Sequence, residues 1–327
     1  NPIAQEFCEL LGIALPVIGG AMYPCSNPEL VAAISEAGGI GIIQPLSLTY
    51  VNGFEFRQGV QHIRTLTEKP IGLNLLIEAT SDRYIDRMMK WTEIALEEGI
   101  RFFVTSLGNP SQFVKIIHAQ NGLVYHNATK ERWALKAIDS GADGLICVNN
   151  RAGGHVGNHP AEKLLNSMSE YGVQLIAAGG ISRASEVKHM IDMGYNGVQL
   201  GTRFIATKEC SAPDNYKQAL LKSKESDIVH TEKLSGVPVS VIMNEKIHKT
   251  GIHANKLEKW LLRGTKTKKY MRMYYSLKSF RSLKKAETSN IYNSYLQAGK
   301  GVEAINSIPS VSEIMTEYSD ALMQSPS

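Results

Sequence analysis

The chain has 327 residues, of which 43% are hydrophobic and 20% charged, with a formal net charge of +4. These proportions argue against an intrinsically disordered or fibrous protein. No apolar run approaches the roughly 18 residues that span a bilayer, and the amino terminus does not suggest a secretory signal. The four cysteines are far apart and form no C-x-x-C pair. We therefore expect neither a zinc site nor a disulfide framework, and predict a cytoplasmic protein.

The first two hundred residues repeat a short apolar run followed by a segment with helical periodicity. Strands alternating with helices form a parallel sheet, and eight such units predict a closed (β/α)₈ TIM barrel. A doubly wound open sheet is the alternative. Several helices precede a glycine suited to a left-handed C-cap, namely Gly38, Gly99, Gly141, Gly172 and Gly194. The predicted strands are 16–20, 41–44, 71–76, 102–106, 123–126, 144–148, 174–178 and 197–200, and the predicted helices include 28–37, 81–98, 111–119, 129–140, 161–171 and 184–193.

The alternation ends near residue 207. Residues 208–289 are rich in Lys, Tyr and Met and predict a small, mainly helical lid domain inserted before the C-terminal helix. The barrel then comprises residues 1–207 and 290–327, with 297–302 in its final helix. Residues 246–285 contain thirteen Lys or Arg and one acid, Glu258. A solvated face is the default interpretation of this run, and electrostatic steering of an acidic carrier protein is the alternative. Nucleic-acid or membrane-surface binding would leave the eight units unexplained, so neither partner is predicted.

Two loops at the carboxyl end of the predicted barrel have the features of an anion site. Gly179-Gly180 follows strand seven and Gly201-Thr202 follows strand eight, the two positions where such barrels commonly bind phosphate. Glycine lets backbone N–H groups approach an anion closely, and Thr202 adds a hydroxyl. Gly179-Gly180 alone would be read as a tight turn, but the pair of loops predicts phosphate binding.

Two further strand ends lie at the same rim. Gly19-Gly20-Ala21-Met22 ends strand one and leaves room for a planar ring against the backbone. Asn74 is a single polar residue in an apolar strand and needs a hydrogen-bond partner, because a buried unpaired amide costs about 1–3 kcal/mol. A ligand ring or the neighbouring loop backbone could provide that partner.

Histidine is the candidate for proton transfer. His155 lies in Ala152-Gly153-Gly154-His155-Val156-Gly157 after strand six, on a loop rather than an apolar face. Histidine has a reference pKa of about 6.5, so a side chain of this type can accept or donate a proton near neutrality. His126, at the end of strand five, is the second candidate. We predict no metal site, because no carboxylate stands at a suitable spacing from these histidines. Cys147 fits a small core residue better than a nucleophile.

Taken together, Gly19-Gly20-Ala21-Met22, Gly72-Leu73-Asn74, Ala152-Gly153-Gly154-His155, Ala178-Gly179-Gly180-Ile181 and Gln199-Leu200-Gly201-Thr202-Arg203-Phe204 resemble the nitronate monooxygenase (2-nitropropane dioxygenase) family. The resemblance covers almost the whole chain in order and extends to the FMN-dependent enoyl-acyl-carrier-protein reductase II enzymes. Tyr23-Pro24-Cys25-Ser26 and the basic lid depart from the common patterns.

The resemblance implies an FMN-dependent oxidoreductase, with catalytic His155 and, as a second candidate, His126. The implied activity is oxidation of alkyl nitronates with O₂. The alternative is NAD(P)H-dependent reduction of an enoyl thioester or quinone. The expected partners are then a small-molecule substrate and either O₂ or NAD(P)H. The sequence does not decide whether the protein forms a homodimer. The predicted FMN-binding residues are Gly20, Ala21, Met22, Asn74, Gly153, Gly154, Gly179, Gly180, Gln199, Leu200, Gly201 and Thr202.

Overall fold

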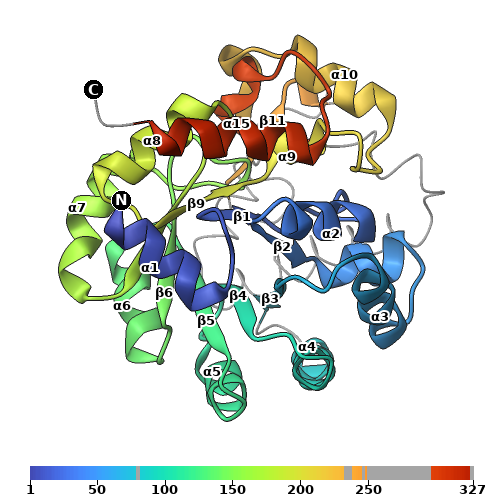
Figure 1. Cartoon of the computed structure of the whole chain (residues 1–327), viewed down its shortest axis with the longest axis vertical. Helices are drawn as coiled ribbons and strands as arrows, with labels where there is room; N and C mark the ends of the chain where they lie inside the picture. Colours follow the sequence, from blue (N-terminus) through green and yellow to red (C-terminus); the bar gives the residue numbers. More distant parts are fainter. Residues whose placement is uncertain (79–81, 232–237, 245–246, 249–295, 325–327) are drawn as a thin grey trace, which may run out of the picture.

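Eight parallel strands close into a barrel in the computed structural model, which describes residues 1–78, 82–231, 238–244, 247–248 and 296–324 (Figure 1). Each strand pairs with its neighbours in the order β1-β2-β3-β4-β5-β6-β8-β9, and β1 also pairs with β9. The predicted TIM barrel is therefore confirmed, and each predicted strand overlaps an observed one. The strands are β1 Val17–Gly19, β2 Ile40–Ile43, β3 Ile71–Ile77, β4 Phe102–Leu107, β5 Leu123–Ala128, β6 Gly144–Val148, β8 Gln174–Ala178 and β9 Gly197–Leu200.

Helices surround the barrel, and apolar residues fill the space between the two layers. All five glycines predicted as left-handed C-caps have positive φ, from 67° at Gly172 to 120° at Gly194. Two helices, α1 and α3, were not predicted. The described helices that precede β9, the last barrel strand, are α1 Pro2–Leu11, α2 Pro28–Glu36, α3 Phe56–Leu66, α4 Asp82–Glu97, α5 Ser111–His118, α6 Glu131–Asp139, α7 Ala161–Met168 and α8 Ala184–Met193, with a π-helical turn at Ser47–Val51 and a 3₁₀ turn at Ser169–Tyr171.

The amino-terminal end of the barrel is closed by aromatic side chains. Phe7 of α1 and Tyr125 of β5 are fully buried with ring centroids 6.1 Å apart. Glycines in the strands make room for them: a Cβ added at Gly144 would lie 2.5 Å from the Tyr125 ring, and one at Gly197 would lie 2.9 Å from Phe7. Because side chains fill the amino-terminal end, a ligand that binds inside the barrel has to bind at its carboxyl end.

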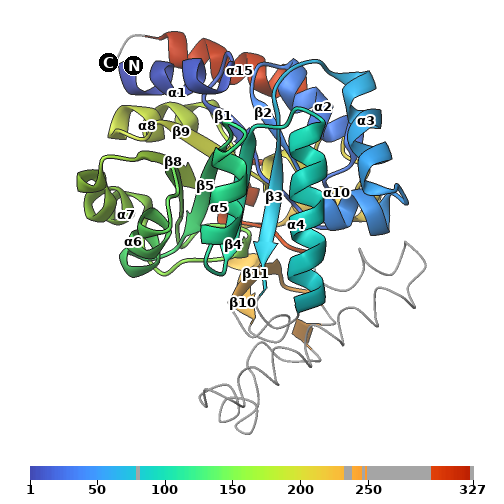
Figure 2. The same ribbon diagram turned by 90° about the horizontal axis from the view of Figure 1, so that it is seen from below.

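The ring of helices is completed by α15 (Val311–Met323), which contacts both α8 and α2. Residues 297–302, predicted as the final helix, instead form a bridge at Gln297 and the start of a 3₁₀ helix, η4 (Lys300–Ala304). Figure 2 shows α15 beside α1. The return helix therefore begins later than predicted, after Ser310, whose side chain caps it.

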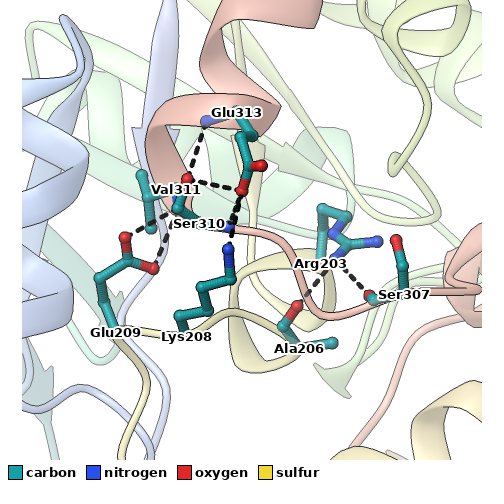
Figure 3. Close-up of polar contacts among 8 residues, drawn as sticks. All are labelled: Arg203, Ala206, Lys208, Glu209, Ser307, Ser310, Val311 and Glu313. Carbon is teal, nitrogen blue, oxygen red and sulfur yellow. Dashed lines mark hydrogen bonds and ion pairs between the residues drawn. The ribbon is translucent and has the colours of Figure 1, made fainter.

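Polar contacts attach the segment after β9 to α15 (Figure 3). The ammonium of Lys208 lies 3.3 Å from the carboxylate of Glu313, and both carboxylate oxygens of Glu209 accept from the Val311 N–H. The Arg203 guanidinium donates to the carbonyl oxygens of Ala206 and Ser307 at 2.7 and 3.0 Å. These contacts hold the turn that follows β9 (α9, Thr202–Ile205) against the end of the chain.

The described part of the predicted lid contains strands as well as helices. After α10 (Asp214–Lys222) and a 3₁₀ turn at Glu225–Asp227 come β10 (Ile228–Thr231) and β11 (Val239–Ile242). With β7 (Gly154–His155) they form a second sheet in the order β10-β11-β7. Figure 2 shows β10 and β11 at the end of the barrel toward which β3 points. Almost all of the basic segment 246–285 lies outside the described residues.

Candidate functional site

A cavity of about 320 Å³ opens at the carboxyl ends of the barrel strands. His155 lines it, together with all of the predicted FMN-binding residues. Among the described lining residues there is no Asp, Glu, Lys or Arg. The predicted residues that meet here are Gly20, Ala21, Met22, Asn74, Gly153, Gly154, Gly179, Gly180, Gln199, Leu200, Gly201 and Thr202.

The loops after β8 and β9 form one end of the cavity. Gly179 and Gly180 have φ values of 119° and 71°, and a Cβ at Gly180 would lie 2.6 Å from that of Arg151. Within the described chain, the backbone N–H groups of Gly180 and Thr202 donate to no acceptor, and the buried hydroxyl of Ser182 has no partner. Unsatisfied donors at a glycine-rich loop are the features of an anion cradle.

Residues 297–301 close this cradle from the far end of the sequence. The Gly299 N–H donates to Oγ1 of Thr202 at 2.9 Å, and the Lys300 N–H donates to the carbonyl of Arg151 at 2.8 Å. A Cβ at Gly301 would lie 2.8 Å from Oγ of Ser182. From the sequence, this segment was predicted to be part of a helix and was not predicted to be part of the site. The signal was Gly299-Lys300-Gly301, because glycines so close together are unfavourable inside a helix.

A second group of residues borders the space beside the cradle. A Cβ at Gly20 would lie 3.1 Å from the Gln199 side chain, and one at Gly201 would lie 3.3 Å from Sδ of Met22. The Met22 loop is held by its N–H, which donates to Oγ of Ser26 at 2.8 Å. Small residues here leave room for a flat group against the backbone.

The Asn74 amide faces the same cavity. It is 9% exposed and has no hydrogen-bond partner in the described chain. The alternative predicted from the sequence, in which the neighbouring loop backbone satisfies it, is therefore not found. An unpaired amide near the ring space supports a polar ligand edge as its partner.

His155 lies on β7, which extends the second sheet. It pairs with Val239 of β11, and the N–H of Val156 donates to the Pro238 carbonyl at 3.3 Å. The sequence predicted a loop here, because a two-residue strand has no pattern of its own. Its side chain is exposed and lines the cavity, so solvent and substrate can both reach the imidazole.

The structure corrects the predicted position of His126, which is not among the described residues that line the cavity. Successive side chains of a strand face opposite sides, and on β5 it is Asn127 that faces inward. Nδ1 of His126 lies 2.9 Å from Oγ1 of Thr105, and burial lowers the pKa of His126 to about 4. This histidine is a core residue of the layer between strands and helices.

The four cysteines are free, and Cys147 is fully buried in β6, where burial raises the pKa of its thiol to about 12. The core interpretation of Cys147 is therefore supported. The described residues hold no group of three potential metal ligands among His, Cys, Asp and Glu. In the same part of the chain, every helix is too short or too polar to cross a bilayer.

A model of the nitronate monooxygenase family matches residues 5–320, and thus spans the barrel, the cavity and α15. The chain belongs to the nitronate monooxygenase family. The match confirms the resemblance inferred from the five motifs and makes this protein an oxidoreductase of the flavin-dependent type.

Relatives of this family member include proteins with different described activities. A probable nitronate monooxygenase of Staphylococcus saprophyticus is 27% identical over 73% of this chain and 79% of its own length. A hydroxy-methyl-oxo-octahydro-indene-carboxyl-CoA dehydrogenase of Rhodococcus jostii is 26% identical over 76% of this chain and 68% of its own. FabK from Thermotoga maritima superposes with a TM-score of 0.79 and 25% identity over 97% and 95% of the two chains. A nitroalkane oxidase of Streptomyces ansochromogenes, 22% identical with a TM-score of 0.74 over 97% of each chain, shares the fold.

Proposed function

We propose that this protein is an FMN-dependent nitronate monooxygenase that oxidises small alkyl nitronates, such as propionate 3-nitronate, with O₂. The observation that carries the proposal is a cavity whose described lining is free of carboxylates and combines an anion cradle with His155. A nitronate is an anion, and a carboxylate in the lining would repel it. The family match and the Staphylococcus relative support the same choice.

The residues present fit FMN. The N–H groups of Gly180 and Thr202, with the unpaired hydroxyl of Ser182, would hold its phosphate. Gly20 and Ala21 would lie against its ring, and the unpaired amide of Asn74 would bond the polar ring edge. When bound, FMN supplies the redox chemistry, in which electrons pass from the substrate to O₂.

His155 would handle the charge and the proton of the substrate. In its imidazolium form it stabilises a nitronate anion beside the ring, and in its neutral form it can accept the α-proton of a nitroalkane. The pairing of β7 with β11 holds the histidine backbone on a sheet rather than on a loose loop. Tyr216 of α10 lines the cavity and donates to the Gln297 carbonyl at 2.6 Å. This contact supports our proposal that the described part of the predicted lid domain borders the site.

Two measurements test this proposal. The purified protein should be yellow, and the flavin released by denaturation should have the mass of FMN. Oxygen uptake should then follow addition of propionate 3-nitronate under aerobic conditions. A colourless protein that does not bind added FMN would contradict the cofactor assignment, and a yellow protein without oxygen uptake on several nitronates would contradict the substrate assignment.

A second candidate is NAD(P)H-dependent reduction of a carrier-linked enoyl thioester or a quinone. The name of the Rhodococcus relative describes a substrate linked to coenzyme A, and the structural similarity to FabK covers 97% of this chain. Under this candidate, NADH or NADPH should bleach the flavin within seconds under anaerobic conditions, and an enoyl thioester should restore the colour. Slow bleaching by both nucleotides would exclude it.

A further inference from the structure

Ser106 and Asn127 form a polar pair near the carboxyl ends of β4 and β5. The register pairs Thr105 with His126, which sets Ser106 beside Asn127 one residue further along. Nδ2 of Asn127 donates to Oγ of Ser106 at 2.6 Å, and both residues line the cavity. Neither residue was predicted from the sequence to have a role, and neither is among the residues proposed above to bind FMN.

This pair has an unmet hydrogen-bonding requirement. Oδ1 of Asn127 is buried and has no partner in the described chain. Reversing the amide would let Ser106 donate to Oδ1 and would turn Nδ2, with its two N–H groups, toward the cavity. In either orientation one amide group is left buried and unpaired beside the cavity, which is unfavourable until a ligand meets it.

The strand order indicates where Asn127 lies relative to the predicted nucleotide site, and so which ligand could reach it. The loops proposed to bind phosphate follow β8 and β9, which lie across the barrel from β3 and β4. A nucleotide held by these loops and by Asn74 would therefore extend along that diameter. Gly20 follows β1, and Asn127 lies near the end of β5, four strands away in either direction. Asn127 is therefore across the cavity from the small residues that would contact the ring. The loop of His155 follows the adjacent strand, β6.

We propose that the Ser106–Asn127 pair hydrogen-bonds the oxygen atoms of the substrate oxyanion, on the side of the ring that faces His155. The inference rests on the proposed function and assigns the substrate-binding residues within it. Oxyanion oxygens only accept hydrogen bonds, so the ligand would select the amide orientation that presents Nδ2, with the Ser106 hydroxyl bonded to Oδ1. The pair would thereby favour substrates with a compact oxygen-bearing head over purely apolar ones.

Three variants test the pair in the FMN-loaded enzyme. Asn127→Leu keeps the approximate size and removes both polar groups, and should raise the KM for the nitronate about tenfold. Asn127→Asp places a carboxylate in the cavity and should raise KM further, because like charges repel. Ser106→Ala should give a smaller increase, and it remains informative if the Asn127 variants fold poorly.

The matched control is Thr105→Ala on the same strand. Thr105 faces His126 and is not among the described lining residues, so this variant should leave KM within twofold of wild type. The FMN dissociation constant, measured by fluorescence quenching, should also stay within twofold in all four proteins. An unchanged KM in both Asn127 variants would overturn the proposal, and so would a loss of FMN affinity in place of a KM effect.

A titration with nitrite separates this inference from the proposed function. Nitrite is an inert nitrogen oxyanion, and its binding can be followed through the flavin absorption spectrum without turnover. Weaker nitrite binding in Asn127→Leu than in wild type supports the pair even if no nitronate is oxidised. Equal nitrite binding in the two proteins overturns the pair even if nitronates are oxidised.

Discussion

Oγ1 of Thr202 accepts a hydrogen bond from the N–H of Gly299 at 2.9 Å, across 97 residues of sequence. Because the hydroxyl oxygen is engaged as an acceptor, its hydrogen is left to point elsewhere, and Thr202 lines the cavity. One side chain thus joins the carboxyl-terminal segment to the loop after β9 and offers a donor at the cradle.

Replacing this hydroxyl should weaken cofactor binding. Thr202→Val leaves the Gly299 N–H without its acceptor and removes the donor, so we expect FMN affinity to fall about tenfold or more. Thr202→Ser keeps both functions of the oxygen and should stay within about threefold of wild type. Equal FMN dissociation constants for Thr202→Val and wild type would show that this hydroxyl does not serve the phosphate.

Gly180 and Gly172 form a matched pair for testing whether a ligand has to approach the backbone closely at Gly180. Their φ values are 71° and 67°, but a Cβ at Gly180 would lie 2.6 Å from Arg151, whereas one at Gly172 would meet nothing within 4 Å. Gly172→Ala should cost about 1 kcal/mol in unfolding free energy, from backbone strain alone. Gly180→Ala should cost more and also reduce FMN binding at least tenfold. Similar stability and FMN affinity in the two variants would contradict the predicted cradle.

His155→Asn should separate catalysis from cofactor binding. The variant retains a polar side chain but cannot take up a proton, so kcat/KM should fall about 10²- to 10⁴-fold. The flavin spectrum and FMN affinity should stay close to wild type, because the predicted phosphate contacts lie in the loops after β8 and β9. Full activity in a yellow His155→Asn protein would remove the histidine from the mechanism.

His126 should make the fold sensitive to acid. Its pKa is lowered by burial to about 4, whereas an unfolded histidine titrates near 6.5. The unfolded state therefore binds more protons between these values, and stability should fall as pH drops from about 6.5 to 4, by about 2 kcal/mol at pH 5. Urea unfolding of wild type and His126→Asn at pH 7 and pH 5 measures this. The decrease in unfolding free energy between pH 7 and pH 5 should be smaller in the variant. An equal decrease in both proteins would show that other groups cause the acid sensitivity.

Much of the barrel could be predicted from local pattern. Each strand is a short apolar run bounded by turn residues, and the crossover helices other than α3 were recognised by their own periodicity, so neither requires knowledge of the rest of the chain. The glycines that end helices were identifiable because only a residue without Cβ tolerates positive φ at low cost. Gly179-Gly180 and Gly201-Thr202 were proposed as an anion site because each pair directly follows a predicted strand, at a position where such barrels commonly bind phosphate.

Other features depended on contacts that no local pattern encodes. The strand containing His155 exists because Val239 lies beside it, and η4 reaches the cradle through Arg151 and Thr202. His126 was misplaced for a different reason. Strands of a parallel barrel are buried on both faces, so composition does not reveal whether residue 126 or 127 faces inward.

By itself, the sequence predicted the eight barrel strands in their order, the loops proposed to bind an anion, and the histidine at the barrel rim, because each is set by residues close together in the chain. Only the tertiary structure decided which side chains of β5 face the cavity, that β7 pairs with β11, and that residues 297–301 lie at the site. These depend on which distant segments pack together, and the free energy of such packing comes from surfaces that meet only in the folded protein.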